Sequence, residues 1–128
     1  MIIPYLVIAP SHQRGRGVFT TKKIAAGTVI EISPVIVLSS KDRQALETTL
    51  LYNYIFEWGK SKKQGGLGLG YISMYNHAYR ANCDYEMDYQ NRLLTIRTVK
   101  PVKKGEELCI NYNAEPDSDK KVWFKEWK

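Results

Sequence analysis

The amino-acid sequence predicts a mostly β fold with one or more short helices. Its 128 residues are enough for one hydrophobic core and too few for two ordinary domains. Short apolar stretches that alternate with polar residues recur along the chain, and turn-forming residues separate them, which is typical of strands. Only residues 41–56 place their apolar side chains at the three- and four-residue steps of a helix.

The first third of the chain is expected to be β-structure followed by that helix. Residues 5–9 and 17–23 read as two strands joined by a turn over 11–16, and Ala26-Gly27 precedes a longer strand over 28–38. Ser40 is a suitable N-cap for the helix.

Glycine and turn residues divide the second half. Residues 59–71 hold five glycines and three lysines, which predicts a mobile loop that leads to a segment packed through its backbone. Two strands are expected within 83–100 around a turn at Gln90-Asn91, and another within 103–113. The last segment begins as an irregular acidic linker, and its aromatic side chains are expected to dock on the body.

Composition limits the classes of protein. The chain is 44% hydrophobic and 25% charged, and it has no apolar run of about 20 residues, so a globular protein without a membrane span is expected. The apolar start lacks the basic region of an export signal. The two cysteines, Cys83 and Cys109, are too few for a four-cysteine zinc site, and a reducing cytoplasm fits them best.

The chain is basic. Lys and Arg number 19 and Asp and Glu 13, which gives a formal net charge of +6, and basic runs occur at 60–63, 100–104 and 120–128. Such a surface attracts polyanions, so nucleic-acid binding is one interpretation. A solvated basic surface without a partner is the commoner meaning and is preferred here.

Residues 75–83, YNHAYRANC, hold two asparagines, a histidine and a cysteine. A zinc site is disfavoured because the other histidine, His12, lies in a distant turn. A nucleophilic pair of Cys83 and His77 lacks an obvious acid beside the histidine. No metal is expected, and the segment is interpreted as one that holds a ligand.

Three stretches, in order and spacing, resemble the signatures of the SET domain, a family of S-adenosylmethionine-dependent protein lysine methyltransferases. They are GRGVFTTKKIAAGTVIE (15–31), YNHAYRANC (75–83) and GEELCINYN (105–113). The resemblance is to the short free-standing SET proteins of bacteria and large DNA viruses. It implies small β-sheets around a knot-like crossing near the C-terminus, and one domain over 1–128 with 114–128 as a short post-SET-like segment.

The resemblance implies methyl transfer from S-adenosylmethionine to a lysine of a protein substrate, with S-adenosylhomocysteine as the product. Such an in-line displacement needs a neutral amine, an aligned methyl group and little water. An apolar aromatic channel disfavours the ammonium form of lysine and so favours the reactive amine. Aromatic side chains are therefore expected around one narrow site.

Site residues follow from the same resemblance. Tyr112 is expected to be the catalytic tyrosine, whose hydroxyl orients the methyl group and the amine. The expected cofactor-binding residues are Arg16, Gly17, Asn76, His77 and Trp123. The expected substrate-channel residues are Tyr54, Tyr71 and Phe124, although core packing explains both tyrosines almost as well. Asn82 and Glu107 are expected to brace the crossing.

The sequence also departs from the family pattern. Ala78 stands where serine is usual, Ala81 stands where proline is common, and no second tyrosine follows Tyr112, which bears on how the lysine channel closes. The cysteine-rich zinc module of many relatives is absent.

Two other functions stay open at this point. One is a catalytically silent SET-like module that binds peptide or nucleic acid, and the other is an assembly role in which the cofactor stabilises the fold. Net charge does not favour a histone-like substrate, although a local acidic groove is an alternative, formed by Glu57, Asp84, Glu86 and Asp88. A homodimer is expected by analogy with minimal relatives.

Overall fold

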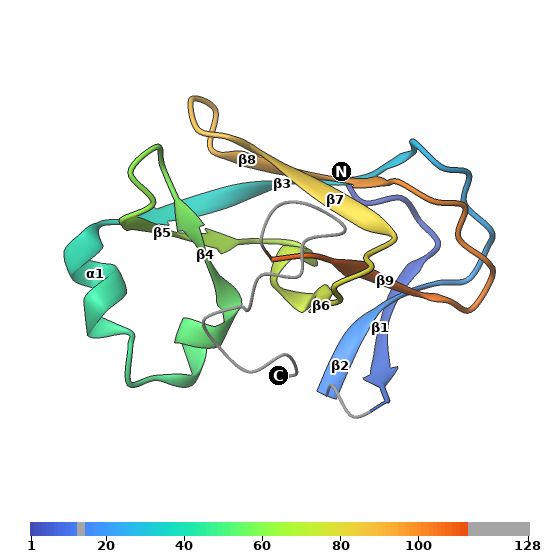
Figure 1. The fold of residues 1–128 in the computed structure, drawn as a ribbon, viewed down its shortest axis with the longest axis horizontal. Coiled ribbons are helices and arrows are strands. Elements are labelled where there is room, and N and C mark those ends of the chain that lie inside the picture. Colours follow the sequence, from blue (N-terminus) through green and yellow to red (C-terminus); the bar gives the residue numbers. More distant parts are fainter. Residues whose placement is uncertain (13–14, 113–128) are drawn as a thin grey trace.

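The computed structural model describes residues 1–12 and 15–112, and the strands there form one continuous curled sheet (Figure 1). The structure is 47% strand, so the predicted mostly β class is confirmed. The strands are β1 (Leu6–Ser11), β2 (Gly15–Thr20), β3 (Val29–Leu38), β4 (Ile55–Trp58), β5 (Gln64–Gly68), β6 (Asn76–His77), β7 (Cys83–Asp88), β8 (Leu93–Thr98) and β9 (Glu107–Ile110). The helices are α1 (Ser40–Ala45) and the 3-10 helices η1 (Leu50–Tyr54) and η2 (Ile72–Met74).

Strand order brings the three sequence motifs together. The order is β1-β2-β9-β7-β8-β3-β5-β4, and β6 pairs with β9 off this path. Strand β9 is antiparallel to β2 and parallel to both β6 and β7. The C-terminal motif therefore lies between the Gly-x-Gly strand on one side and the strand that begins at Asn76 on the other.

The hydrophobic core forms where the central strands bury alternate side chains. Val18, Leu94, Ile96, Leu108 and Ile110, from β2, β8 and β9, are fully buried. Burial of one such side chain stabilises the fold by about 1.5–3 kcal/mol, so β2, β8 and β9 are held firmly together.

The predicted helix over 41–56 is wrong as a single element. Helix α1 ends after Ala45, η1 follows, and residues 55–58 form strand β4. Thr49 helps to end the helical turn, because its hydroxyl donates to the carbonyl of Leu46 at 2.7 Å and so competes with the backbone ladder. The N-cap is Ser39, whose hydroxyl accepts from the backbone N–H of Asp42 at 3.1 Å, and α1 begins at Ser40.

The predicted mobile loop over 59–71 instead contains strand β5, which pairs with both β3 and β4. Its glycines permit close packing. A Cβ on Gly66 would lie 2.9 Å from the Trp58 ring, and a Cβ on Gly68 would collide with Ile72. The expectation of a segment packed through its backbone holds for these residues.

A carboxylate lies inside the core. Glu31 on β3 accepts from the Ser33 hydroxyl at 2.7 Å, from the Tyr71 backbone N–H at 2.8 Å and from the Tyr75 hydroxyl at 2.8 Å. Burial raises the pKa of Glu31, while the three donors favour its charged form. This network ties β3 to the segment that leads directly into Asn76. None of the described helices is long and apolar enough to cross a membrane.

Candidate active site

Asn76 stands at the centre of the site, on the short strand β6. Its side chain has no exposed surface, and its Nδ2 donates to the carbonyl of Arg16 at 3.0 Å and to Oε2 of Glu107 at 2.7 Å. Its Oδ1 is buried and accepts no hydrogen bond from the residues that the structure describes. Since an unsatisfied buried acceptor costs about 1–3 kcal/mol, this oxygen marks a place where a ligand donor fits.

Gly17 lets β2 approach this amide closely. A Cβ on Gly17 would overlap Oε2 of Glu107 and lie 2.8 Å from Nδ2 of Asn76. The family resemblance predicts that Gly17 contacts the cofactor. In the structure the groups that a Cβ would meet are the protein's own side chains, so the glycine is required for the Asn76–Glu107 bond itself.

Glu107, in the third motif, joins the end of β1 to Asn76 of the second motif. Its Oε1 accepts from the Ser11 hydroxyl at 2.7 Å at the end of β1, while its Oε2 accepts from Asn76. With both oxygens engaged, the carboxylate fixes the amide orientation, so that Nδ2 faces Glu107 and Oδ1 faces away.

Tyr112 lies just beyond β9, after Asn111, and is held at three points. Its hydroxyl donates to the carbonyl of Tyr75, its backbone N–H donates to Nδ1 of His77 at 3.1 Å, and its carbonyl accepts from the Tyr85 hydroxyl at 3.0 Å. The acceptor role makes Nδ1 the unprotonated ring nitrogen of His77. His77, predicted to contact the cofactor, therefore also positions the tyrosine.

Aromatic rings surround Tyr112. The ring of Phe56 meets it edge-on at 6.0 Å between centroids and meets Tyr85 at 5.4 Å, and the His77 ring lies 5.3 Å from Tyr112. Tyr79 packs edge-on against His77 at 4.5 Å. Phe56 and Tyr85 were not identified as site residues from the sequence. Their alternation with polar residues in short segments is the only sequence signal that they carry, and it does not indicate a role in the site.

Asn82 straps the segment after β6 onto β9. Its Oδ1 accepts from the Cys109 backbone N–H at 2.9 Å, and its Nδ2 donates to the Glu107 carbonyl at 2.9 Å and to Oε2 of Glu106 at 3.1 Å. The backbone N–H of Ala78 also donates to the Ile110 carbonyl at 3.0 Å. The crossing expected from the family resemblance corresponds to these contacts.

The other predicted site residues divide into two groups. Tyr54 and Tyr71 are half-buried: the carbonyl of Tyr54 accepts from the Ser73 hydroxyl, and the backbone N–H of Tyr71 donates to Glu31, so their place in a substrate channel stays a prediction. Trp123 and Phe124 lie outside the described residues.

The acidic residues noted in the sequence lie on the other face. Side chains alternate along a strand, so Asp84 and Glu86 point away from the face of Tyr85, and Glu57 points away from the face of Phe56. Burial, followed by the repulsion of Glu86, raises the pKa of Asp84, while Arg97 opposes the shift. These carboxylates therefore do not form a groove around Tyr112.

Two alternative chemistries lack support within the part of the chain that the structure describes. No three His, Cys, Asp or Glu side chains there come together as a metal site. Cys83 and Cys109 are free and buried, and burial raises the pKa of the Cys83 thiol, which keeps it protonated and unreactive near neutral pH.

Comparisons with known proteins match this geometry. The SET domain family model matches residues 15–113. The chain is 36% identical over 122 residues to the histone-lysine N-methyltransferase, H3 lysine-37 specific, of Schizosaccharomyces pombe, covering 94% of this chain and 78% of that protein.

Two solved structures are similar. A candidate histone methyltransferase of Plasmodium falciparum is 25% identical with a TM-score of 0.66, covering 87% of this chain and 95% of the other. A humanized mutant of the Chaetomium thermophilum Polycomb Repressive Complex 2, bound to an inhibitor, is 20% identical with a TM-score of 0.68, covering 84% of this chain and 14% of the other. The second likeness concerns the fold alone.

Proposed function

The chain belongs to the SET domain family and is a protein lysine methyltransferase, and from this premise we propose that it methylates a histone lysine with S-adenosylmethionine as donor. The activity of the fission-yeast relative supports a histone as substrate, because the two chains match over nearly all of this one. The observation that carries the proposal is the junction of Asn76 and Tyr112 at β9, where the three motifs meet.

The residues at this junction fit the donor. The buried Oδ1 of Asn76 needs a hydrogen-bond donor, and the ammonium of a methionine moiety is one. Arg16, Gly17, Asn76 and His77 would hold this group. When bound, S-adenosylmethionine supplies a methyl group on a positively charged sulfur.

Tyr112 is suited to orient the reacting groups and unsuited to act as a base. Its hydroxyl proton is directed to the carbonyl of Tyr75, so the lone pairs of the oxygen stay available as acceptors. A lysine amine and the hydrogens of a polarised methyl group are donors that such an oxygen can align. Alignment of this kind accounts for a large part of the acceleration of a displacement reaction.

The rings of Phe56, Tyr85 and His77 provide an apolar surrounding for a lysine side chain. Loss of water around an ammonium lowers its pKa, which increases the fraction of neutral amine. Ring faces also stabilise a residual positive charge, including that of a methylated product.

Methylation of purified histones, followed by mass spectrometry, tests the proposal. We expect Tyr112→Phe to reduce the rate by about 10²-fold, a typical cost of losing one positioned polar group, and to keep the affinity for S-adenosylmethionine. Tyr89→Phe is the matched control, since Tyr89 is exposed and packs on Trp58, and it should methylate at the wild-type rate.

Equal rates for Tyr112→Phe and wild type would refute the assigned role. Cofactor binding without methylation of any histone would favour the silent binding module. The homodimer remains a prediction. The two free cysteines support a reducing compartment, which includes the predicted cytoplasm as well as the nucleus.

A further inference from the structure

A lysine-rich surface lies at one end of the molecule, away from Tyr112, where two loops run side by side (Figure 1). The first loop connects β2 to β3 and the second connects β8 to β9. Ile24 and Val102 join them through reciprocal backbone hydrogen bonds of 2.9 and 2.8 Å. We call this surface the paired-loop surface, and its exposed lysines are Lys22, Lys23, Lys100, Lys103 and Lys104.

Strand pairing on either side brings the two lysine pairs of these loops close in space. Val18 faces Leu108 and Phe19 faces Glu107 in β2 and β9, and the Ile24–Val102 bridge continues the same register. The intervening segments, 20–23 and 103–106, are therefore of equal length; the first bends at 21–22, and the second is a turn closed by a bond from the Glu106 N–H to the Lys103 carbonyl at 3.0 Å. Each carries two lysines, although like charges on adjacent segments destabilise a fold.

The surface has little compensating negative charge. Its five lysines face a single carboxylate, Glu106, across residues 20–28 and 99–106, a surplus of four in a chain whose net charge is +6. Both oxygens of Glu106 are already engaged, by the Lys103 backbone N–H at 3.0 Å and by Asn82 at 3.1 Å. Lys22 lies over the Tyr5 ring, with its Nζ 5.7 Å from the ring centroid. No carboxylate that the structure describes pairs with the other four lysines, and all five are exposed.

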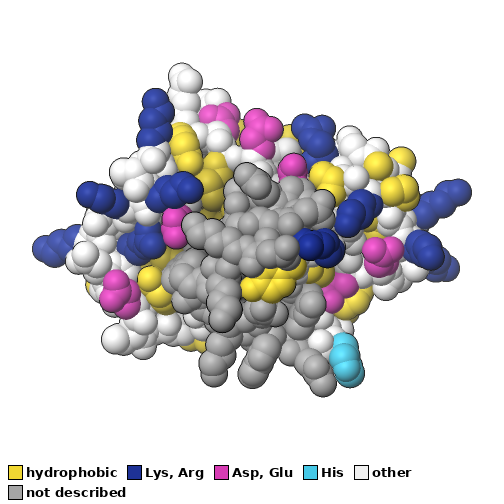
Figure 2. Space-filling view, in the orientation of Figure 1, with side chains coloured by type: hydrophobic (Ala, Val, Ile, Leu, Met, Phe, Trp, Pro, Cys, Tyr) yellow, Lys and Arg dark blue, Asp and Glu magenta, His cyan; other side chains and the backbone are white. Residues whose placement is uncertain are grey.

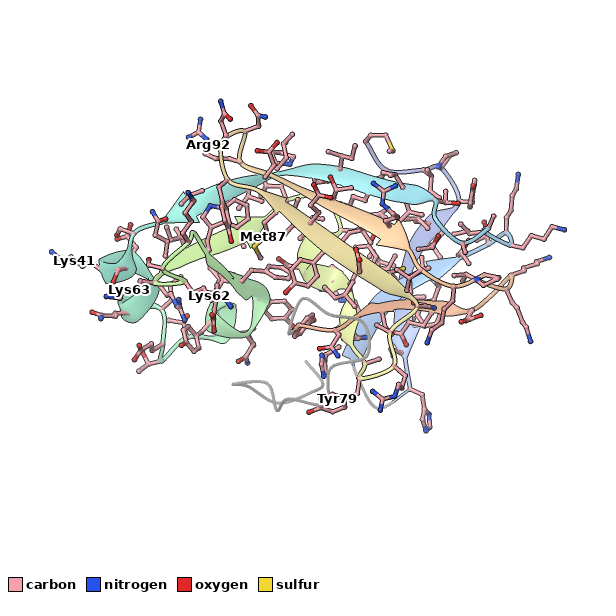
Figure 3. All side chains as sticks on the ribbon, turned by 45° about the horizontal axis from the view of Figure 1, so that its top comes forward. Lys41, Lys62, Lys63, Tyr79, Met87 and Arg92 are labelled. Carbon is pink, nitrogen blue, oxygen red and sulfur yellow. The ribbon has the colours of Figure 1, made fainter. Side chains whose placement is uncertain are left out.

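The opposite end of the molecule provides the contrast. Lys41, Lys60, Lys62 and Lys63 lie there, around α1 and the turn between β4 and β5, and Figure 3 shows three of them at that end. Asp42, Glu47 and Glu57 are interspersed among them in the sequence. Figure 2 shows one face of the molecule, with dark blue Lys and Arg side chains at both of its ends. Within residues 1–12 and 15–112, only the paired-loop surface combines a dense lysine cluster with almost no acid.

We propose that the paired-loop surface binds the phosphate backbone of double-stranded DNA without sequence preference. Duplex DNA carries one negative charge per about 1.7 Å of its axis, so a lysine cluster with almost no acidic neighbour attracts it. Lysines are flexible point charges that neutralise phosphates without reading bases. The paired-loop surface therefore offers the positive charge that sequence-independent binding to the phosphate backbone requires.

A lipid surface fits less well. Segments that bind at a membrane interface insert apolar side chains beside their basic residues. Ile24 and Val102, which lie between the lysines, are turned into the core with 4% and 2% of their surface exposed. Val99 is the one large apolar side chain exposed in residues 20–28 and 99–106, so the surface is charged with little apolar area for insertion.

DNA binding at this surface does not depend on the proposed function, since it involves neither the donor nor the substrate lysine. The surface begins where β2 ends at Thr20 and where β9 is about to start at Glu106, whereas Tyr112 follows the other end of β9. A histone methyltransferase with such a surface would be concentrated on chromatin with its active site open.

Fluorescence anisotropy with a labelled random-sequence duplex tests the proposal. We expect wild-type affinity to fall with a logarithmic salt slope of about −4, which is about 250-fold between roughly 50 and 200 mM salt. A variant with Lys22, Lys23, Lys103 and Lys104 replaced by Gln should lose most of its affinity, and its slope should fall close to −1. Thermal unfolding of each variant verifies its fold.

The matched control replaces Lys41, Lys60, Lys62 and Lys63 by Gln. Both variants lose four positive charges from the same total of +6, so they differ only in where the charge is removed. The control should keep the wild-type slope to within about one. Equal loss of affinity in the two variants would overturn the assigned surface, and so would tight binding to anionic lipid vesicles by a wild-type protein that does not bind DNA.

Discussion

Replacing Asn82 by Ala tests how strongly the segment after β6 is strapped to β9. The substitution removes an acceptor from the Cys109 N–H and a donor from both the Glu107 carbonyl and the Glu106 carboxylate. Because Cys109 is buried, its N–H would lose its partner without access to water. The same strand leads directly to Tyr112, so this loss of stability is expected to reach the site.

The size of the effect follows from these contacts. An unsatisfied buried N–H costs about 1–3 kcal/mol and each lost bond about 0.5–1.5 kcal/mol, so we expect about 3 kcal/mol of lost stability. For a domain of this length that corresponds to a fall in Tm of about 10 °C. Asn91→Ala is the control, because Asn91 bonds Asp88 at an exposed turn, and it should cost at most about 0.5 kcal/mol.

Thermal and urea unfolding measure the difference. Asn82→Asp adds a second test, since the introduced carboxyl keeps the acceptor for Cys109 but faces the Glu106 carboxylate. That repulsion raises the pKa of the introduced carboxyl in the folded state, so the variant should gain stability as pH falls and the carboxyl becomes protonated. A loss of unfolding free energy below about 1 kcal/mol for Asn82→Ala would refute the claim that Asn82 holds the segment after β6 on β9.

Two further predictions concern a buried charge and a close approach. The folded pKa of Glu31 is raised, so its contribution to stability is complete below the ordinary pKa and is lost as pH rises through the folded pKa. Glu31→Gln should abolish that loss in urea titrations across pH, and parallel curves for the two proteins would contradict the prediction. Gly17→Ala should cost about 1–3 kcal/mol through overpacking against Glu107 and weaken donor binding. Gly27→Ala, whose added Cβ would meet nothing within 4 Å despite a φ of +81°, should leave donor affinity unchanged.

Local patterns in the sequence predict the strands well. The regions of β1, β2, β3, β7, β8 and β9 carry alternation and turn residues, and each contains its predicted strand. Strand β5 could not be predicted this way, because its glycines are explained only by the Trp58 and Ile72 side chains that pack over them. Contacts of that kind join residues far from any short motif.

The candidate site likewise contains residues that short motifs predict and residues that only long-range contacts bring in. Asn76 and Tyr112 are predictable because their motifs carry them, and the structure brings both to β9. Phe56 and Tyr85 were not predictable, since their contacts with Tyr112 cross from β4 and β7 to the end of β9. Strand alternation turns Asp84 and Glu86 away from the face of Tyr85, so an acidic groove stays a prediction for a surface other than the one around Tyr112.

Calorimetric titration with S-adenosylmethionine tests the central claim most directly, that the free Oδ1 of Asn76 belongs to a methyl-donor site beside Tyr112. We predict saturable one-site binding by the wild-type protein and by Tyr112→Phe, and affinity at least about tenfold weaker for Asn76→Ala, as expected for loss of a hydrogen bond to a charged group. Thermal unfolding shows whether each variant is folded. Wild-type protein that binds no S-adenosylmethionine, or folded Asn76→Ala that binds it as tightly as wild type, would contradict the claim.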